Sequence, residues 1–402
     1  MHALSDVRIL DLTQHIAGPY CTKMLADYGA NVIKLERPGT GDLSRSMGPF
    51  PEDIPHREKS GVFLHLNTNK RGITLDIKSD TGRKIFLDLV DHVDVVIENF
   101  VPSTLSSIGL SYKTLESINP KIIMVSISNF GQTGPYKDYK ASEIVLQGMG
   151  GNLHSLGIPE REPTKYGTEI ALRQCGLIAA SATMASLFTR EKRGAGEHVD
   201  VSIFETQAGS QDRRVPQLMT AQFINKVFPR REPGSSIASG TFPCKDGYIN
   251  ISGGGNRFPR VLEMLERSEL IDDPKFSTPA ARTNSINGEF FNSEILMPWL
   301  MQYTMKEAWA LAQKAHVLSG PIYTSESLME DSHFQDRGMW VDIDHPVAGK
   351  YTFPGRPFIM SETPWTLRMP APTLGQHNNE IYQGLLGYTA QDIVRLSGTN
   401  II

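Results

Sequence analysis

The first 130 residues alternate short apolar runs with stretches in which apolar positions follow a helical period. The run VRILDL, Val7–Leu12, is typical of a buried strand, and NVIKLE, Asn31–Glu36, predicts a second strand. Between them, PYCTKMLADYGA predicts a helix that begins near Pro19 and ends near Gly29. A strand, a helix and a second strand in this order predict a βαβ unit.

The same alternation returns further along the chain. A helical pattern around Thr81–Asp91 precedes two strand-like runs, VDVVIENF and KIIMVSIS. The helical stretch after Gly167 and the segment GEHVDVSIFET, which ends at Thr206, extend the series. Strands that alternate with helices predict a parallel sheet covered by helices, so the expected fold class is α/β.

The pattern changes near Phe228, where turn-forming residues and short strand candidates begin. We expect a large domain whose N-terminal part spans residues 1–200, a linker over 201–227 and a small α+β domain over 228–330. Residues 331–402 are expected to form a second linker and a return to the large domain, ending in a helix near Asn379–Leu396.

Composition excludes several classes of partner. The 40 basic and 44 acidic residues leave a net charge of −4, which gives no long-range attraction to nucleic acid or to anionic membranes. The longest weakly apolar stretch, Gly176–Phe188, is shorter than the roughly 20 residues of a membrane span. Asp6, Arg8 and Asp11 stand where a signal peptide would be apolar, so a cytoplasmic location is expected.

The cysteines carry no sign of a disulfide framework or of a metal site. Cys21, Cys175 and Cys244 are far apart and lack the CxxC spacing. We expect three reduced thiols and no bound metal.

Several stretches could bind an anion at the carboxyl edge of the sheet. The junction LTQHIAGPY follows the first strand and opens the first helix, where free backbone N–H groups from Ile16 to Tyr20 would point at a ligand. His15 in this junction is either a ligand contact or a structural loop residue. Arg37 and the pair Lys70–Arg71 follow or flank other strands, and they would either converge on a polyphosphate or form a solvated basic surface.

Two further features are weaker. Gly253, Gly254 and Gly255 form a run directly after a strand, which suits a lid that approaches a ligand but also a loop without function. Glu143 lies beside an apolar helical pattern and is either a site acid or a surface charge. No GxGxxG dinucleotide fingerprint is present.

Together these stretches resemble the class III (CaiB/BaiF) CoA-transferase family. The resemblance rests on these segments, in family order: ILDLTQHIAGPYCTKMLADYGANVIKLERPGTGD, NKRGITLDIK, DVVIENFVP, GQTGPY, GEHVDVSIFE, PCKDGYINI and APTLGQH. It implies a Rossmann-like large domain formed from both termini, a smaller α+β domain and an interlocked dimer. It implies CoA thioesters as substrates, no permanently bound cofactor, and CoA contacts at His15, Ile16, Ala17, Arg37, Lys70, Asn99, Phe100 and Lys140.

The chain departs from the family at the nucleophile. In active relatives a pattern G-x-x-I-x-D-x-x-x-G supplies an aspartate that attacks the donor thioester. Aligned on Gly167, Ile170 and Gly176, that aspartate falls on Leu172, which cannot form an anhydride. Ser107 and Ser142 also replace residues that contact CoA or line the site in formyl-CoA transferase.

The favoured hypothesis is therefore a non-catalytic subunit of a heteromeric transferase whose paralogous partner supplies the aspartate. Succinyl-CoA:(R)-benzylsuccinate CoA-transferase, from anaerobic aromatic degradation, is a two-subunit member of this kind. One alternative is an active homodimer that uses Glu169 as a displaced nucleophile. Another is an acyl-CoA racemase-like isomerase in which His154 and Glu169 handle the proton. A binding or scaffold protein is the remaining possibility.

Overall fold

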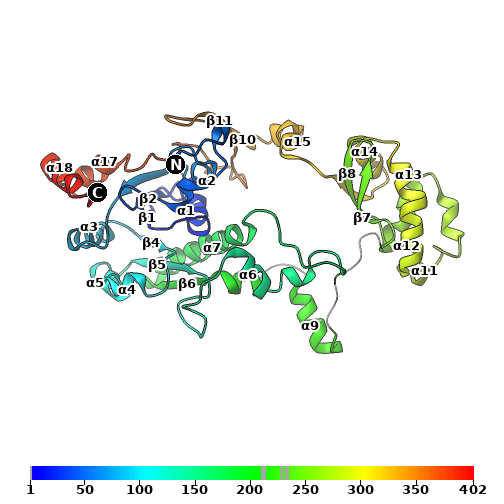
Figure 1. Cartoon of the computed structure of the whole chain (residues 1–402), viewed down its shortest axis with the longest axis horizontal. Coiled ribbons are helices and arrows are strands. Elements are labelled where there is room, and N and C mark those ends of the chain that lie inside the picture. Colours follow the sequence, from blue (N-terminus) through cyan, green and yellow to red (C-terminus); the bar gives the residue numbers. More distant parts are fainter. Residues whose placement is uncertain (1, 210–213, 227–229, 231–234) are drawn as a thin grey trace. The chain divides into compact units, whose positions relative to one another are not determined.

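The computed structural model describes residues 2–209, 214–226, 230 and 235–402 (Figure 1). It divides into two compact units. The large unit comprises Met1–Leu153, Lys165–Val227 and Asp336–Ile402, and the small unit comprises His154–Thr164 and Phe228–Gln335.

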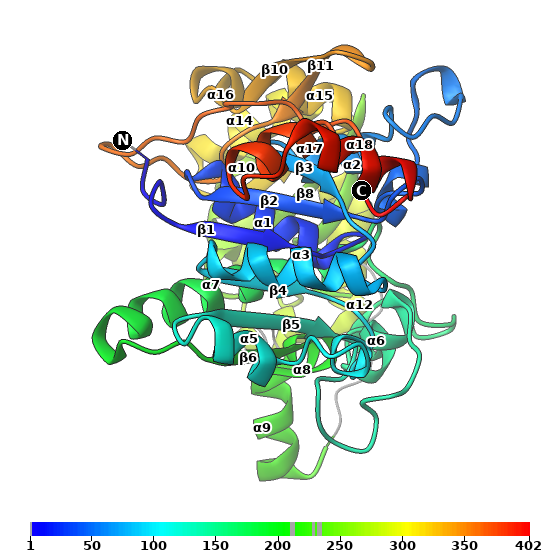
Figure 2. The same ribbon diagram turned by 90° about the vertical axis from the view of Figure 1, so that its left-hand side faces the viewer.

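A six-stranded sheet forms the centre of the large unit (Figure 2). All five strand pairs are parallel, and the order is β3-β2-β1-β4-β5-β6. This is a Rossmann-like order, in which the direction of strand succession reverses between β1 and β4. The strands are β1 (Arg8–Asp11), β2 (Asn31–Glu36), β3 (Lys70–Thr74), β4 (Val95–Glu98), β5 (Ile123–Ser128) and β6 (His198–Ser202).

Helices cover both faces of this sheet because its strands are apolar on both sides. On one face α1 (Ala17–Asp27) and α7 (Ile170–Arg193) share a core with alternate residues of β1, β4 and β5. The other face is covered by helices from both ends of the chain. These are α3 (Asp80–Asp91), α5 (Tyr112–Ile118), α17 (Asn378–Gly384) and α18 (Ala390–Gly398). The remaining helices of the large unit are α2 (Gly61–Leu66), α4 (Thr104–Ser107), α6 (Glu143–Met149), α8 (Ile203–Gly209) and α9 (Arg214–Ile224).

Helices α1 and α7 approach each other closely at Gly176. A Cβ atom at this position would lie 2.6 Å from the carbonyl oxygen of Ala17 and 3.2 Å from the amide nitrogen of Cys21. Glycine is therefore required where the two helix backbones meet. The contact fixes the start of α7 against the start of α1.

The C-terminal segment returns to the large unit, as the sequence analysis expected. The hydroxyl of Tyr382 on α17 donates a hydrogen bond to the carbonyl oxygen of Thr74 at the end of β3, at 2.6 Å. A hairpin of β10 (Trp340–His345) and β11 (Gly349–Pro354) precedes this return.

The small unit is α+β. Its sheet is antiparallel in the order β7-β8-β9, with β7 (Ser239–Cys244), β8 (Gly247–Ser252) and β9 (Leu318–Pro321). An aromatic cluster of Phe258, Phe276 and Phe291 lies in its core. The helices are α10 (Phe258–Met264), α11 (Pro279–Thr283), α12 (Ser285–Phe291), α13 (Met297–Leu300), α14 (Met305–Lys314) and α15 (Ser325–Glu330), and α16 (Ser332–Asp336) spans the end of the unit.

Two segments differ from the expected organisation. Residues 201–227, expected as a linker, contain α8 and α9 and group with the large unit. His154–Thr164, expected within the large domain, groups with the small unit.

The apolar stretch judged too short for a membrane span lies within a longer helix. Among the described helices α7 is the one whose length and composition would allow it to cross a membrane. Its buried residues belong to the core of the large unit, as in the central helix of a globular domain.

Candidate functional site

The loop between β1 and α1 has a fixed and unusual backbone. His15 adopts a left-handed conformation with φ 72°, and its backbone N–H donates to Oδ1 of Asp42 at 2.9 Å. The neighbouring Gln14 backbone is paired with the Asn99 side chain through two hydrogen bonds of 2.8 Å, one from N–H and one to the carbonyl oxygen. The loops after β1 and β4 are therefore held together at the point where the strand order reverses.

Buried ion pairs hold this loop in place. Asp11 is fully buried and its carboxylate lies 3.1 Å from the ammonium group of Lys70. Lys34 forms a second buried ion pair with Asp42 at 2.7 Å and donates to the carbonyl oxygen of Thr13 at 2.8 Å. The loss of one partner from such a buried pair strongly destabilises a protein, because it leaves the other charge buried without a counter-ion.

The pKa values of the first pair reflect both burial and pairing. Burial alone would raise the pKa of Asp11, but Lys70 and Lys34, together with the hydroxyl groups of two threonines, lower it to about 2. Burial lowers the pKa of Lys70 to about 8, although the Asp11 carboxylate opposes this change. Both groups are therefore charged at neutral pH.

Lys70 differs in position from the other predicted CoA contacts. Its ammonium group is fully buried, and besides the Asp11 ion pair it donates to the Pro19 carbonyl oxygen, the Thr22 hydroxyl and the Asn67 side chain. The ammonium group of Lys70 is therefore occupied by partners within the chain, which gives it a structural role at the β1–α1 junction. Its contact with CoA stays a prediction.

A cavity of about 590 Å³, here called the central cavity, lies at the carboxyl edge of the sheet. Five of the predicted CoA contacts line it together: His15, Ala17, Asn99, Phe100 and Lys140. Ligands of open α/β sheets bind at this edge, beside the reversal of strand order. The sequence-based grouping of these residues thus agrees with a single hollow, and their contact with CoA stays a prediction.

The start of α7 closes one side of the central cavity. Leu172, only 9% exposed, and Glu169 both line it. Leu172 is the third residue of α7, and Glu169 immediately precedes the helix at its N-cap position. Leu172, at the position predicted to correspond to the family's nucleophile, and Glu169, the candidate displaced carboxylate, therefore line the same space.

Glu143 has a role that the sequence did not reveal. Its carboxylate accepts a hydrogen bond from the backbone N–H of Ala171 at 2.8 Å, and it lies 4.0 Å from the ammonium group of Lys165. Negative charge at a helix N-terminus is stabilising, because the free N–H groups there carry partial positive charge. Glu143 is thus a partly buried cap of α7 rather than a surface charge.

Arg37 lies in a neighbouring hollow. A second cavity, of about 580 Å³, is lined by Arg37, His56 and Arg57. The β1–α1 loop borders both cavities, because Gln14 lines the second cavity and His15 lines the central cavity. Arg37 is exposed, and a phosphate group would be held there by charge. Ile16, in contrast, is fully buried, so its side chain packs in the core.

The two serines that depart from the family pattern, Ser107 and Ser142, lie in different places. Ser142 lines the central cavity, whereas Ser107 is exposed on α4 and its hydroxyl donates to the carbonyl oxygen of Thr104 at 2.7 Å. The sequence analysis missed Ser128 and Asn129, which also line the cavity. Ser128 ends the run KIIMVSIS and Asn129 follows it directly, so both could have been found from the rule that ligands bind where parallel strands end.

The glycine run lies in the small unit. A Cβ at Gly253 would lie 2.3 Å from Cγ2 of Val261, and Gly255 has φ 62°. Close packing and a left-handed backbone therefore explain two of the three glycines. Their proposed action as a lid stays a prediction.

The comparison with known proteins decides the family. Residues 4–378 match the family model described as CoA-transferase family III. This chain belongs to the class III CoA-transferases. Members of this family use CoA thioesters as substrates. The activity that gives the family its name is the transfer of CoA to a carboxylic acid.

Curated relatives match along the whole chain. The succinyl-CoA–D-citramalate CoA-transferase of Chloroflexus aurantiacus is 33% identical, over 99% of this chain and 98% of the relative. The formyl-CoA:oxalate CoA-transferase of Streptomyces avermitilis is 32% identical, over 100% and 99%. The succinyl-CoA:glutarate CoA-transferase of Mus musculus is 33% identical, over 100% and 91%.

A solved structure shares the fold. The crystal structure of a CAIB/BAIF family protein from Brucella suis has a TM-score of 0.81 and 31% sequence identity, covering 96% of this chain and 99% of that one. The mixed α/β architecture with a large parallel and a small antiparallel sheet is therefore that of the family.

Proposed function

We propose that this chain is a non-catalytic subunit of a heteromeric class III CoA-transferase, in which a paralogous subunit supplies the nucleophilic aspartate. The observation that carries the proposal is Leu172, which lines the central cavity beside the predicted CoA contacts His15, Asn99 and Lys140. In the covalent route a carboxylate oxygen bonds to the thioester carbonyl carbon and the CoA thiolate leaves. A leucine has no lone pair to form that bond.

The remaining groups of the cavity support binding of a thioester without its chemistry. The loops after β1 and β4 are fixed by the paired hydrogen bonds between Gln14 and Asn99, so their shape is set before a ligand enters. Lys140 supplies an exposed positive charge at the rim, and Arg37 supplies one in the neighbouring cavity. We propose that these groups hold CoA.

Exposed apolar surface on α7 supports a requirement for a partner chain. Ile170, Leu177 and Met184 recur every seven residues along α7 and are 45%, 44% and 40% exposed. Phe188, on the same helix, is 60% exposed. Apolar stripes at this spacing are typical of helices that pack against another helix.

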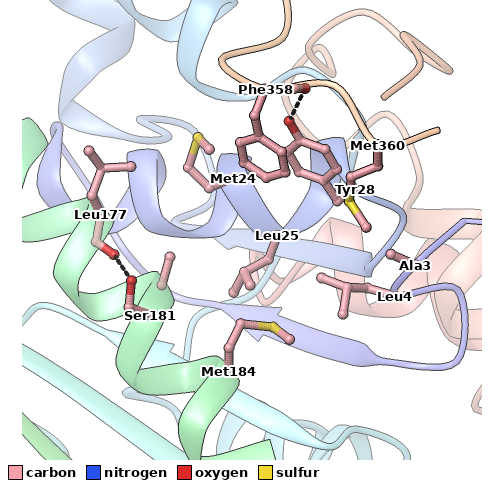
Figure 3. A pocket seen from close by; sticks show the side chains of 11 residues that line it. Ala3, Leu4, Met24, Leu25, Tyr28, Leu177, Ser181, Met184, Phe358 and Met360 are labelled. Atoms are coloured by element: carbon pink, nitrogen blue, oxygen red, sulfur yellow. Dashed lines mark hydrogen bonds between the residues drawn. The ribbon is translucent and has the colours of Figure 1, made fainter. Parts of the chain in front are cut away.

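A groove beside this stripe strengthens the argument (Figure 3). It has a volume of about 290 Å³ and is lined by α1, α7 and residues 358–360, including Met24, Met184 and Met360. Its hydroxyl groups are already used, because Tyr28 donates to the Phe358 carbonyl oxygen at 2.9 Å and Ser181 donates to the Leu177 carbonyl oxygen at 3.0 Å. The groove suits the side chains of an interlocked, paralogous subunit.

The proposed donor is succinyl-CoA and the proposed acceptor is a dicarboxylic acid such as benzylsuccinate. Two of the relatives described above are named for succinyl-CoA, which supports the donor. The acceptor follows from the two-subunit member that the sequence resembles.

One observation favours a second candidate function, an active homodimer that uses Glu169. The Glu169 side chain lines the same cavity as Leu172, and within the described residues it makes no capping hydrogen bond to α7. Its carboxylate is thus available there. The isomerase hypothesis gains no comparable support, because His154 is not among the described residues that line the central cavity.

The test is turnover by the chain with and without its partner. The chain purified alone is incubated with succinyl-CoA and benzylsuccinate, and the thioesters are separated by chromatography; we expect no transfer. Co-expression with a paralogue that carries the aspartate should give a 1:1 complex, which native mass spectrometry would detect. This complex should transfer CoA in the same assay. Turnover by the isolated chain that disappears in Glu169→Gln would refute the proposal and establish the homodimer.

A further inference from the structure

A buried acid lies directly behind the central cavity. Glu98 is the last residue of β4, is 5% exposed and precedes Asn99 and Phe100, which both line the cavity. Its carboxylate accepts a hydrogen bond from the backbone N–H of Phe100 at 2.7 Å. Glu98 thus fixes the backbone that presents Asn99 to the Gln14 loop.

The strand register connects Glu98 to the edge of the sheet. Glu98 is paired with Ser126 on β5, so their side chains share one face of the sheet, and the Ser126 hydroxyl favours the ionised form of Glu98. The same hydroxyl lies 2.9 Å from Nε2 of His198 on β6. His198 is an exposed residue whose ring stacks on Tyr112, so Glu98, Ser126 and His198 form a row of polar side chains that leads to the surface.

We propose that Glu98 is a positioning residue whose ionisation state sets the geometry of the Asn99–Pro102 side of the central cavity and thereby the affinity of this chain for CoA. This inference rests on the proposed function only in assuming that the cavity binds CoA. It does not depend on catalysis by either subunit.

The two protonation states differ in their hydrogen bonds. The carboxylate accepts from Phe100 N–H and from the Ser126 hydroxyl, and charge-assisted bonds of this kind are about twice as strong as neutral ones. When Glu98 is protonated, its carboxyl group donates a hydrogen bond to the hydroxyl oxygen of Ser126. The Ser126 hydroxyl then donates its own proton to Nε2 of His198. Protonation therefore weakens the bond that holds Phe100 and leaves the buried acid neutral.

The surroundings place this change near neutral pH. Burial raises the pKa of Glu98 to about 7, the bonds from Ser126 and Phe100 oppose that rise, and the Asp200 carboxylate adds to it. The neighbouring titratable group beyond Ser126 is His198. Burial lowers the pKa of its imidazole, which favours the neutral form, and the Asp200 carboxylate opposes this change.

The experiment measures CoA binding to the full chain by calorimetry between pH 6 and pH 8. If CoA binds the ionised form alone, the dissociation constant should rise about tenfold as the pH falls across this range, in proportion to the fraction ionised. Glu98→Gln keeps an oxygen that accepts from Phe100 but cannot ionise, so its affinity should be flat with pH. The titration of CoA itself is common to both proteins and cancels in the comparison.

Two matched variants test the mechanism by shifts of opposite sign. Ser126→Ala removes a bond that favours the carboxylate, so the midpoint should move to higher pH. Asp200→Asn removes a nearby negative charge and keeps an oxygen that can accept from Gln132 N–H, so the midpoint should move to lower pH. A residue with a merely structural role would not produce opposite shifts.

Three results would overturn the inference. They are equal pH dependence in the parent chain and in Glu98→Gln, midpoints that fail to separate in the two variants, and no CoA binding at any pH. The last result would also refute the proposal that the cavity groups hold CoA, but it would leave the non-catalytic subunit role intact, since such a subunit need not bind CoA. Turnover by the isolated chain would instead refute the subunit proposal and leave this inference standing.

Discussion

The carboxylate of Glu143 accepts a hydrogen bond from the backbone N–H of Ala171, the residue before Leu172. The start of α7 is therefore satisfied by a side chain from α6 and does not require an acid at position 172. This relationship explains how a well-formed helix presents a leucine to the cavity.

Glu143→Ala should destabilise the chain by about 1.5 to 3 kcal/mol, the usual value of a hydrogen bond to a charged group. Glu169→Ala is the matched control, because Glu169 makes no capping bond within the described residues and its loss should change stability by less than about 0.5 kcal/mol. Urea unfolding measures both. Equal stability of the two variants would show that the cap contributes nothing.

Leu172→Asp should not restore covalent chemistry to the isolated chain. The new carboxylate would stand among the buried residues of the α1–α7 core, where burial raises its pKa, and the cavity retains Ser142 in place of the residue of active relatives. The measurement is hydroxylamine trapping of an acyl adduct after addition of succinyl-CoA. Leu172→Asn controls for the change in packing, and an adduct at residue 172 as abundant as on the partner's aspartate would contradict the expectation.

Lys70→Met should destabilise the protein by about 3 to 5 kcal/mol, because it leaves the Asp11 carboxylate buried without its counter-ion. Arg71→Met is the neighbouring control. Arg71 pairs with Glu380 at the surface, where both side chains are partly exposed, and such a bridge contributes about 0 to 1 kcal/mol. Comparable losses from the two substitutions would mean that Lys70 is not a structural residue.

The stability of the parent chain should fall relative to Glu98→Gln as the pH rises from about 4.5 to about 8. The folded-state pKa of Glu98 lies above its ordinary value, so the folded state holds this proton more tightly than the unfolded state. The resulting stabilisation is complete below pH 4.5 and is lost as the pH passes 7, a change of about 3 kcal/mol. Denaturant titrations of both proteins across this range give the difference directly, and parallel curves would count against the raised pKa.

Lys140→Ala should weaken CoA binding about tenfold or more if its ammonium group meets a phosphate or carboxylate in the central cavity. Lys121→Ala is the control, since Lys121 is equally exposed but precedes the amino end of β5, away from the ligand edge. Calorimetry with CoA compares the two. Identical affinities would remove Lys140 from the predicted contacts.

The alternation of apolar runs predicted a parallel sheet from the segments that form β1, β2, β4, β5 and β6, but it did not mark β3, which begins at Lys70 itself. The burial of Lys70 was hidden for a related reason. A lysine beside an arginine in NKRG looks solvated, and nothing local reveals that its partner is Asp11, 59 residues earlier in the chain. The cap of α7 by Glu143 was hidden for the same reason, as it joins two helices across a long loop.

The bond between Tyr382 and Thr74 joins residues 308 positions apart. During synthesis β3 leaves the ribosome long before α17 and α18, which cover it on one face. The small unit lies between them in sequence and is complete first, since it ends at Gln335. The order of translation therefore leaves one face of β3 uncovered until α17 and α18 emerge.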